Sequence, residues 1–200
     1  MPTGTRYITL LAEGENWIFM TKRNQFIIIG SGLVLILVFI IIGFVKCSSN
    51  DVYDFDPGRD TAGIMQNFKE DFYWLSAVLD FDVPYMLQTH SPNKNPEYYG
   101  KLRIKVIRDM GQTAAFTTYY KLTPETGWIQ FVSVNRRFRG KGYGKKLVDY
   151  AVKDLFKMGC KEVKLVTRTN NLWSQRIYDR YGFIQYKRDN GFVDYVLKKP

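Results

Sequence analysis

The sequence is poor in the residues that build metal centres and disulfide frameworks. Its 200 residues include two cysteines, Cys47 and Cys160, and a single histidine, His90. Two cysteines so far apart form neither a zinc-binding spacing nor a disulfide framework. We therefore expect no metal cofactor, and the low cysteine usage fits a protein that works in a reducing compartment.

Acidic residues are also scarce relative to basic ones. The chain has 29 lysines and arginines against 19 aspartates and glutamates, which gives a net charge of +10. A basic surface suits an anionic partner such as a phosphorylated cofactor, nucleic acid or a membrane, and it fits a solvated basic face equally well. Aromatic residues, in contrast, are abundant, with fourteen tyrosines and fourteen phenylalanines. Such a chain can bury a sizeable core.

One long uncharged run, Phe26–Val45, lies near the amino terminus. As a helix it would span about 30 Å, the thickness of a hydrocarbon core. We therefore predict a single transmembrane helix over residues 26–45, preceded by a tail (1–25) and followed by a polar linker (46–58). The alternatives are a buried core helix, a cleaved signal peptide and a lipid-modified Cys47. The run is longer than the apolar part of a signal peptide, and Lys46 stands where a small residue would precede a lipidated cysteine.

The remaining residues, 59–200, show the hydrophobic periodicities of a mixed α/β domain. A period near 3.6 predicts helices over 59–79, 83–89, 144–158 and 172–181. Alternation and β-forming residues predict strands over 101–108, 113–122, 128–134, 163–167, 184–188 and 193–197. Short turns join the first three strands, as in an antiparallel meander. The order of elements predicts a largely antiparallel central sheet flanked by helices.

A glycine-rich turn lies between a predicted strand and a predicted helix. Its residues are Arg139, Gly140, Lys141, Gly142, Tyr143 and Gly144. Glycines there allow close approach of a ligand, and the N–H groups of a helix start form an anion site. Six basic side chains surround the turn: Arg136, Arg137, Arg139, Lys141, Lys145 and Lys146. The turn lacks the Walker and dinucleotide-binding patterns. It predicts a phosphate site, with a solvated turn or a nucleic-acid patch as alternatives.

The turn matches the pattern Arg-x-x-Gly-x-Gly and resembles the acyl-CoA loop of the GNAT superfamily of N-acetyltransferases. A second motif lies downstream, where Asn171 is followed seven residues later by Tyr178 and then by Gly182 and Phe183. This spacing resembles a second motif of the same family. The resemblance covers residues 51–200 and is strongest from 128 to 183. It implies a GNAT-like fold and the transfer of an acetyl group from acetyl-CoA to a primary amine.

The resemblance also implies roles for individual residues. A strand that diverges from its neighbour would bind the pantetheine arm through its backbone, as an added strand. The implied cofactor-binding residues are Phe131, Val132, Val134, Arg139, Gly140, Lys141, Gly142, Tyr143, Gly144, Lys145, Asn171 and Tyr178. The N–H group of Val132 would polarise the thioester carbonyl. Asn171 would orient the arm, and Tyr178 would protonate the departing thiolate.

The general base is not evident from the sequence. Many relatives carry a glutamate in the strand before the loop, and here that strand has none. Glu125 lies just before the strand and is our candidate base. Gln130 within the strand could orient a water molecule, and His90 is a further alternative. The missing glutamate leaves open an inactive acyl-CoA-binding module, and the basic run leaves open a membrane-tethered nucleic-acid binder.

Basic residues beside the apolar run indicate its orientation only weakly. Arg6, Lys22 and Arg23 precede it, and Lys46 and Arg59 follow it. This slight excess favours an inside amino terminus, which would place the large domain outside. Because acyl-CoA is supplied in the cytoplasm, we expect a single-pass membrane protein with a cytoplasmic catalytic domain. Its partners would be acetyl-CoA and an unidentified amine, with no nucleic acid.

Overall fold

The computed structural model describes residues 10–13, 16–20, 26–30, 51–76, 81–92 and 100–200. The chain divides into two compact units, Met1–Ser48 and Ser49–Pro200. In the first unit, the described strands β1 (Leu10–Glu13), β2 (Asn16–Met20) and β3 (Phe26–Gly30) form an antiparallel sheet in that order.

The start of the predicted transmembrane helix is a strand in the structure. Phe26–Gly30 pairs with β2, where the sequence predicts the first helical turns. The segment reads Phe-Ile-Ile-Ile-Gly, and a short apolar run of aromatic and β-branched residues forms strands as readily as helices. The rest of the run, residues 31–45, lies outside the described residues. Among the described helices, none is long and apolar enough to cross a membrane.

The second unit is built on one sheet, whose described strands lie in the order β4–β5–β6–β7–β8–β10–β9. The strands are β4 (Val52–Asp54), β5 (Arg103–Asp109), β6 (Gln112–Lys121), β7 (Thr126–Val134), β8 (Glu162–Arg168), β9 (Ile184–Asp189) and β10 (Phe192–Lys198). Neighbouring strands are antiparallel except for β7 and β8, which are parallel.

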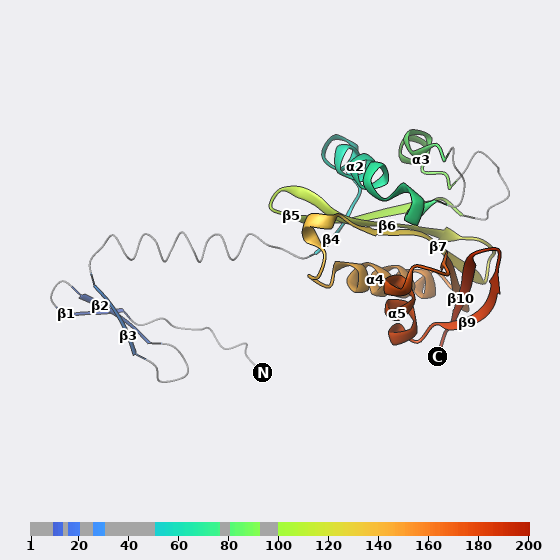
Figure 1. Ribbon diagram of the computed structural model, residues 1–200. Helices are drawn as coiled ribbons and strands as arrows, with labels where there is room; N and C mark the ends of the chain where they lie inside the picture. Colours follow the sequence, from blue (N-terminus) through green and yellow to red (C-terminus); the bar gives the residue numbers. More distant parts are fainter. Residues whose placement is uncertain (1–9, 14–15, 21–25, 31–50, 77–80, 93–99) are drawn as a thin grey trace. The chain divides into compact units, whose positions relative to one another are not determined.

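Helices cover both faces of this sheet (Figure 1). They are α2 (Pro57–Leu75), α3 (Val83–Thr89), the short 3-10 helix η1 (Arg136–Phe138), α4 (Tyr143–Lys157) and α5 (Leu172–Tyr181). The helices α2 and α3 lie on one face, and α4 and α5 lie on the other. The predicted fold class, a mixed α/β domain with a largely antiparallel sheet flanked by helices, is confirmed.

Most element bounds follow the hydrophobic pattern. The helix over 172–181 matches its prediction residue for residue, and α4 differs by one residue at each end. The largest difference is at the predicted linker, 46–58. Val52–Asp54 forms the edge strand β4, and α2 starts at Pro57, within that same segment. Asp56 caps α2 by accepting a hydrogen bond from the Gly58 N–H, and proline is favoured in the first helical turn.

A buried charge network fixes α2 to the strands β5 and β6. The Asp60 carboxylate is fully buried and accepts hydrogen bonds from Arg108 (2.5 and 2.9 Å), from the Thr113 hydroxyl (2.9 Å) and from the Asp56 N–H (2.8 Å). Burial by itself would raise the pKa of Asp60, but these hydrogen bonds outweigh it and lower the pKa. The ionised form is therefore the one that stabilises the fold.

We expect Asp60→Asn to lower the free energy of unfolding by about 3–5 kcal/mol, because Arg108 would lose its buried partner. Asp149→Asn is the control, since its ion pair with Lys153 is exposed and contributes about 1 kcal/mol or less. The lowered pKa means that this stabilisation is present at neutral pH and is lost as the pH falls through that pKa. Urea unfolding at neutral and acidic pH checks both statements, and equal stabilities of the two variants would contradict them.

Candidate active site

The strands β7 and β8 pair over only the first part of their length and then diverge. Their pairing runs from Thr126 opposite Glu162 to Ile129 opposite Leu165 and ends there. Yet β7 continues to Val134 and β8 to Arg168. Among the described strands, none pairs with the β8 side of residues 130–134. This side of β7 therefore offers backbone groups to a ligand that can add as a strand.

A β-bulge at Gln130 accompanies this divergence. Thr118 of β6 pairs with Phe131, whereas the next residue, Tyr119, pairs with Ile129, so Gln130 is the extra residue. The bulge reverses the alternation of the strand: Ile129 packs with the α4 side of the core, and Phe131 packs with α2 and α3. Sequence reasoning missed the bulge, although two adjacent apolar residues, Phe131 and Val132, already break the alternation.

The glycine-rich turn has the geometry of an anion site. Gly140 and Gly142 both have φ of +81°, a conformation that side chains rarely adopt. Gly142 is the N-cap of α4, and no side chain caps the helix there. The first N–H groups of a helix have no partner within the helix, and they carry partial positive charge. Among the described residues, and apart from the glycine and its chain neighbours, no atom lies within 4 Å of a Cβ placed on Gly140 or Gly142, so a ligand has access to the turn.

The basic side chains of the turn are more constrained than the sequence indicates. Arg136 and Arg139 both form ion pairs with Asp71 of α2, and Lys141 forms one with Asp109 of β5. Both carboxylates are buried, with 5% and 3% of their side chains exposed. These ion pairs were not evident from the sequence, which shows only that six basic side chains surround the turn. Three of the six already have carboxylate partners within the protein.

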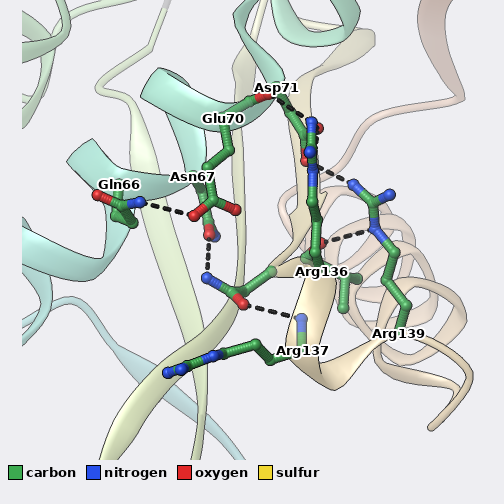
Figure 2. A network of polar contacts seen from close by, with 9 residues as sticks. Gln66, Asn67, Glu70, Asp71, Arg136, Arg137 and Arg139 are labelled. Atoms are coloured by element: carbon green, nitrogen blue, oxygen red, sulfur yellow. Dashed lines mark hydrogen bonds and ion pairs between the residues drawn. The ribbon is translucent and has the colours of Figure 1, made fainter.

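Figure 2 shows the network that joins α2 to the turn. The guanidinium of Arg136 donates to Asp71 Oδ1 (2.9 Å) and to the carbonyl of Glu70 (2.7 Å). Arg139 donates to Asp71 Oδ2 and, through Nε, to the carbonyl of Val134 (3.2 Å). Asp71 escaped the sequence prediction. Its position could have revealed it, because Asp71 lies three residues after Phe68 and four before Leu75, on the helix face where an apolar residue is expected.

The remaining turn residues take different positions. Tyr143 is buried, and its hydroxyl donates to the Asp109 carboxylate at 2.7 Å. Lys145 is exposed in the first turn of α4. A Cβ placed on Gly144 would lie 3.6 Å from Val134 of β7 and 3.8 Å from Ile177 of α5. The structure thus brings together the glycine-rich turn, the diverging strand and the helix that carries Tyr178.

Both predicted residues of the second motif lie on α5. Asn171 is the N-cap, and its side-chain oxygen accepts a hydrogen bond from the Ser174 N–H (3.2 Å). Tyr178 is buried against Phe183 and Tyr195, with ring centroids 6.0 and 5.5 Å away. Burial, together with the neighbouring Tyr195, raises the pKa of Tyr178 to about 12. Its phenol is therefore protonated throughout the physiological range.

Glu125, the predicted base, lies at the other end of β7. It precedes Thr126, where β7 and β8 are still paired, and its side chain is 61% exposed in an ion pair with Lys161. Six residues lie between it and Val132, a distance of about 23 Å along an extended strand. This placement argues against a role in catalysis, and no other contact of the Glu125 side chain points to one.

Two other base candidates have contrasting surroundings. The ring of His90 packs beside Phe55, at a centroid distance of 6.0 Å, and burial together with Lys101 lowers its pKa. Gln130 lies at the bulge itself. Its side-chain N–H donates to the carbonyl of Pro92 (2.9 Å), and among the described residues its buried Oε1 has no hydrogen-bond partner. Gln130 is thus the polar side chain that the structure places beside the divergence.

Arg168, the last residue of β8, links this strand to the end of α2. It donates to the carbonyls of Tyr73 (2.6 Å) and Ser76 (3.0 Å) at the end of α2. Its guanidinium also lies 4.0 Å from the ring centroid of Tyr73 and 5.0 Å from that of Phe192. The end of β8, the end of α2 and the β9–β10 hairpin are therefore held together.

Comparison with known protein families agrees with this geometry. Residues 61–183 match the model of the acetyltransferase (GNAT) family. The chain belongs to this family. The match includes α2, the diverging strands, the glycine-rich turn and α5, and it confirms the predicted resemblance. In the described part of the chain, no group of three or more His, Cys, Asp or Glu residues could hold a metal ion.

Individual GNAT proteins resemble shorter parts of the chain. N-alpha-acetyltransferase MAK3 of Arabidopsis thaliana is 37% identical over 62 residues, which are 31% of this chain and 33% of that protein. Spermine/spermidine N(1)-acetyltransferase of Bacillus subtilis is 32% identical over 73 residues, or 36% of this chain and 45% of that protein. The chain thus spans less than half the length of these two relatives.

Solved structures extend the likeness in fold to most of the second unit. The NatC complex bound to Gag peptide and CoA aligns with 75% of this chain and 98% of its own, with a TM-score of 0.56 and 21% identity. At that identity the likeness concerns the fold. It is membership of the acetyltransferase (GNAT) family that points to acyltransferase chemistry.

Proposed function

We propose that this protein is an N-acetyltransferase that transfers the acetyl group of acetyl-CoA to a primary amine by direct attack. The observation that carries the proposal is the meeting of three features at Gly144: the glycine-rich turn, the unpaired side of β7 and the helix of Tyr178. An anion site, a strand edge and a phenol are the groups that a pyrophosphate, a pantetheine arm and a departing thiolate require.

The cofactor would lie along β7 and across the turn. Backbone groups of Phe131, Val132 and Val134 would bind the pantetheine arm, and N–H groups of residues 139–145 would bind the pyrophosphate at the start of α4. The φ of +81° at Gly140 and Gly142 and the open space beside both glycines support this arrangement. Acetyl-CoA supplies the activated acyl group, and the protein supplies its binding and orientation.

The chemistry would need two groups from this chain. As the amine nitrogen bonds to the thioester carbonyl carbon, negative charge develops on the oxygen, and the N–H of Val132 would stabilise it. The C–S bond then breaks, and Tyr178 would give a proton to the thiolate. The pKa of about 12 lies above that of a thiol, so transfer to a free thiolate is uphill, and the proton would have to move as the C–S bond breaks. The amine loses one proton, and Tyr178 regains one.

The proton released by the amine would leave through water held by Gln130. The Nε2–Pro92 hydrogen bond fixes the amide so that its buried Oε1 remains available as an acceptor. An amide assists by orienting water or amine but does not itself titrate. In this scheme the acceptor must arrive as the neutral amine, and the rate at low pH is limited by the ionisation of the acceptor.

Gln130→Met should therefore lower kcat/KM for the acceptor about tenfold, since a positioned water and its acceptor would be lost. The KM for acetyl-CoA should change less than twofold, because Gln130 is not among the proposed cofactor contacts. The pH dependence of kcat/KM should follow the pKa of the amine used, in the wild type and the variant alike. Initial rates with two amines of different pKa measure this, and a profile that is the same for both amines would contradict it.

For the acceptor we propose only a chemical class, the primary amines. The names of the relatives refer to protein α-amines and to polyamines, and both are primary amines. A screen of CoA release by the full-length protein, with peptides of varied first residue and with polyamines, tests the proposed function. Release with at least one amine supports it. Saturable acetyl-CoA binding without release over the whole panel would favour an inactive acyl-CoA-binding module instead.

The ion pairs of the turn count against the nucleic-acid alternative. Arg136, Arg139 and Lys141 each bind a buried carboxylate, which reduces the charge available to a polyanion. Membrane anchoring rests only on the uncharged run Phe26–Val45, most of which lies outside the described residues. Extraction of the full-length protein from membranes at high pH tests whether it is anchored there. Protease protection tests the proposed cytoplasmic placement of the catalytic domain.

A further inference from the structure

Asp71 occupies an unusual position in α2. Only 5% of its side chain is exposed, although it lies in the last part of an otherwise amphipathic helix. Its backbone departs from helical values, with φ of −127° and ψ of 23°, so α2 is kinked at this residue. A buried carboxylate requires partners. Here both partners, Arg136 and Arg139, come from the glycine-rich turn and the 3-10 helix before it.

Arg139 connects Asp71 to two parts of the proposed cofactor site. Its Nε donates to the carbonyl of Val134, the last residue of β7, while its terminal nitrogen binds Asp71 (Figure 2). The residue after Arg139 is Gly140, which starts the positive-φ part of the turn. One guanidinium thus joins the end of the diverging strand, the start of the turn and α2. Because the turn contains three glycines, its conformation needs such external support.

We infer that Asp71 is a positioning residue for the cofactor turn: through Arg139 it fixes the direction in which the N–H groups of residues 140–144 point. Arg136 forms a second ion pair with the same carboxylate, and it also donates a hydrogen bond to the carbonyl of Glu70. This inference rests on the proposed function, since it assigns a role toward the cofactor. Asp71 itself does not contact the cofactor, and it acts through the arginines.

The ion pairs have two opposite consequences for an incoming pyrophosphate. The single negative charge of Asp71 offsets one of the two positive charges beside the anion site, which weakens binding, and the ion pairs hold the backbone N–H groups in place, which strengthens it. The side chains of Arg136 and Arg139 are 57% and 53% exposed, so water screens their long-range attraction. Backbone N–H groups at a helix start act at contact distance and depend on geometry. Positioning should therefore outweigh the loss of charge.

The test measures binding of acetyl-CoA and of acetyl-pantetheine, which lacks the pyrophosphate, to the full-length protein by calorimetry. Asp71→Asn keeps the shape of the side chain and removes its charge. It should weaken acetyl-CoA binding about tenfold, as expected for the loss of hydrogen bonds to a charged group. Binding of acetyl-pantetheine should change less than twofold. A nonspecific loss of structure would weaken both ligands alike.

Glu70→Gln is the matched control. Glu70 is adjacent to Asp71 and carries the same charge, but its side chain bonds to Gln66 at an exposed site, and Arg136 binds only its backbone carbonyl. This variant should bind acetyl-CoA as the wild type does. In steady-state kinetics, Asp71→Asn should raise KM for acetyl-CoA and leave kcat within about twofold, which separates positioning of the cofactor from chemistry.

A double-mutant cycle shows whether Asp71 acts through Arg139. Arg139→Gln should also weaken acetyl-CoA binding, and adding Asp71→Asn to it should have little further effect. Additive effects would overturn the inference, as would an Asp71→Asn variant that binds acetyl-CoA as well as, or better than, the wild type. If Asp71→Asn does not fold, Arg139→Gln alone decides, with unchanged binding overturning the inference. A wild-type protein without affinity for acetyl-CoA would overturn the proposed function as well.

Discussion

Replacement of Tyr178 by phenylalanine is expected to lower kcat about 100-fold, with KM for acetyl-CoA within twofold of the wild-type value. The phenol would donate a proton to the departing thiolate, and removal of a positioned general acid costs about two to four orders of magnitude. The substitution keeps the ring, so the packing against Phe183 and Tyr195 remains. Initial rates over a range of acetyl-CoA concentrations separate kcat from KM.

The pH dependence adds a second check on Tyr178. Its pKa is raised to about 12 by burial and by the neighbouring Tyr195, so its acid form persists from pH 6 to pH 9. The wild-type kcat should therefore show no alkaline fall in that range that is due to this group. Tyr178→Phe should lower kcat by the same factor at each pH. Full activity of the variant across this range would rule out the proton-donor role.

Tyr181→Phe is the matched control for this experiment. Tyr181 lies on the same helix, but its hydroxyl donates to Asp149 of α4 at 3.0 Å, outside the proposed site. Burial and that carboxylate raise its pKa as well. A raised tyrosine pKa on α5 is thus not sufficient for a role in catalysis. The kcat of Tyr181→Phe should stay within about twofold of the wild-type value.

Gly142→Val is expected to weaken acetyl-CoA binding by at least about tenfold. Gly142 has φ of +81°, and a β-branched residue in that conformation costs about 1–2 kcal/mol. The added side chain would also enter the open space beside the turn, where the pyrophosphate is proposed to lie. Both effects act at the N-terminus of α4, so the N–H groups of the anion site would be displaced or covered. Calorimetric titration with acetyl-CoA measures the change.

Gly191 provides the control for backbone strain. It has φ of +80° in the turn between β9 and β10, and in the described part of the chain no atom beyond its immediate neighbours lies within 4 Å of a Cβ placed there. Gly191→Val therefore carries a similar strain without entering the proposed pyrophosphate site. It should lower the thermal stability about as much as Gly142→Val and leave acetyl-CoA affinity unchanged. Equal losses of affinity in the two variants would mean that the turn at 139–144 has no special role.

The local features of the site were predictable from the sequence. The positive φ at Gly140 and Gly142, the start of α4 and the whole of α5 follow from glycine chemistry and helical periodicity. The spacing between Asn171 and Tyr178 also indicated the family. These features depend on residues that are neighbours along the chain, and local rules therefore describe them.

Features that depend on distant parts of the chain were not predictable in the same way. Arg139 pairs with Asp71, 68 residues away, and Lys141 pairs with Asp109, 32 residues away. The sequence shows the cations and the carboxylates, but it does not show which of them pair in the folded chain. Glu125 illustrates the converse, because closeness in sequence does not place a side chain near the divergence of the strands. It lies close to β7 in sequence, yet it stands at the end of the strand where β7 and β8 are still paired.

We propose that this GNAT domain moves an acetyl group from acetyl-CoA to an amine. This proposal is tested most directly by measuring acetylated amine and free CoA in the same reaction, with the full-length protein and the best amine of the screen. We expect equal amounts of both products, formed about 100-fold more slowly by Tyr178→Phe. Release of CoA without acetylated amine, or acetyl-CoA binding without either product, would contradict it.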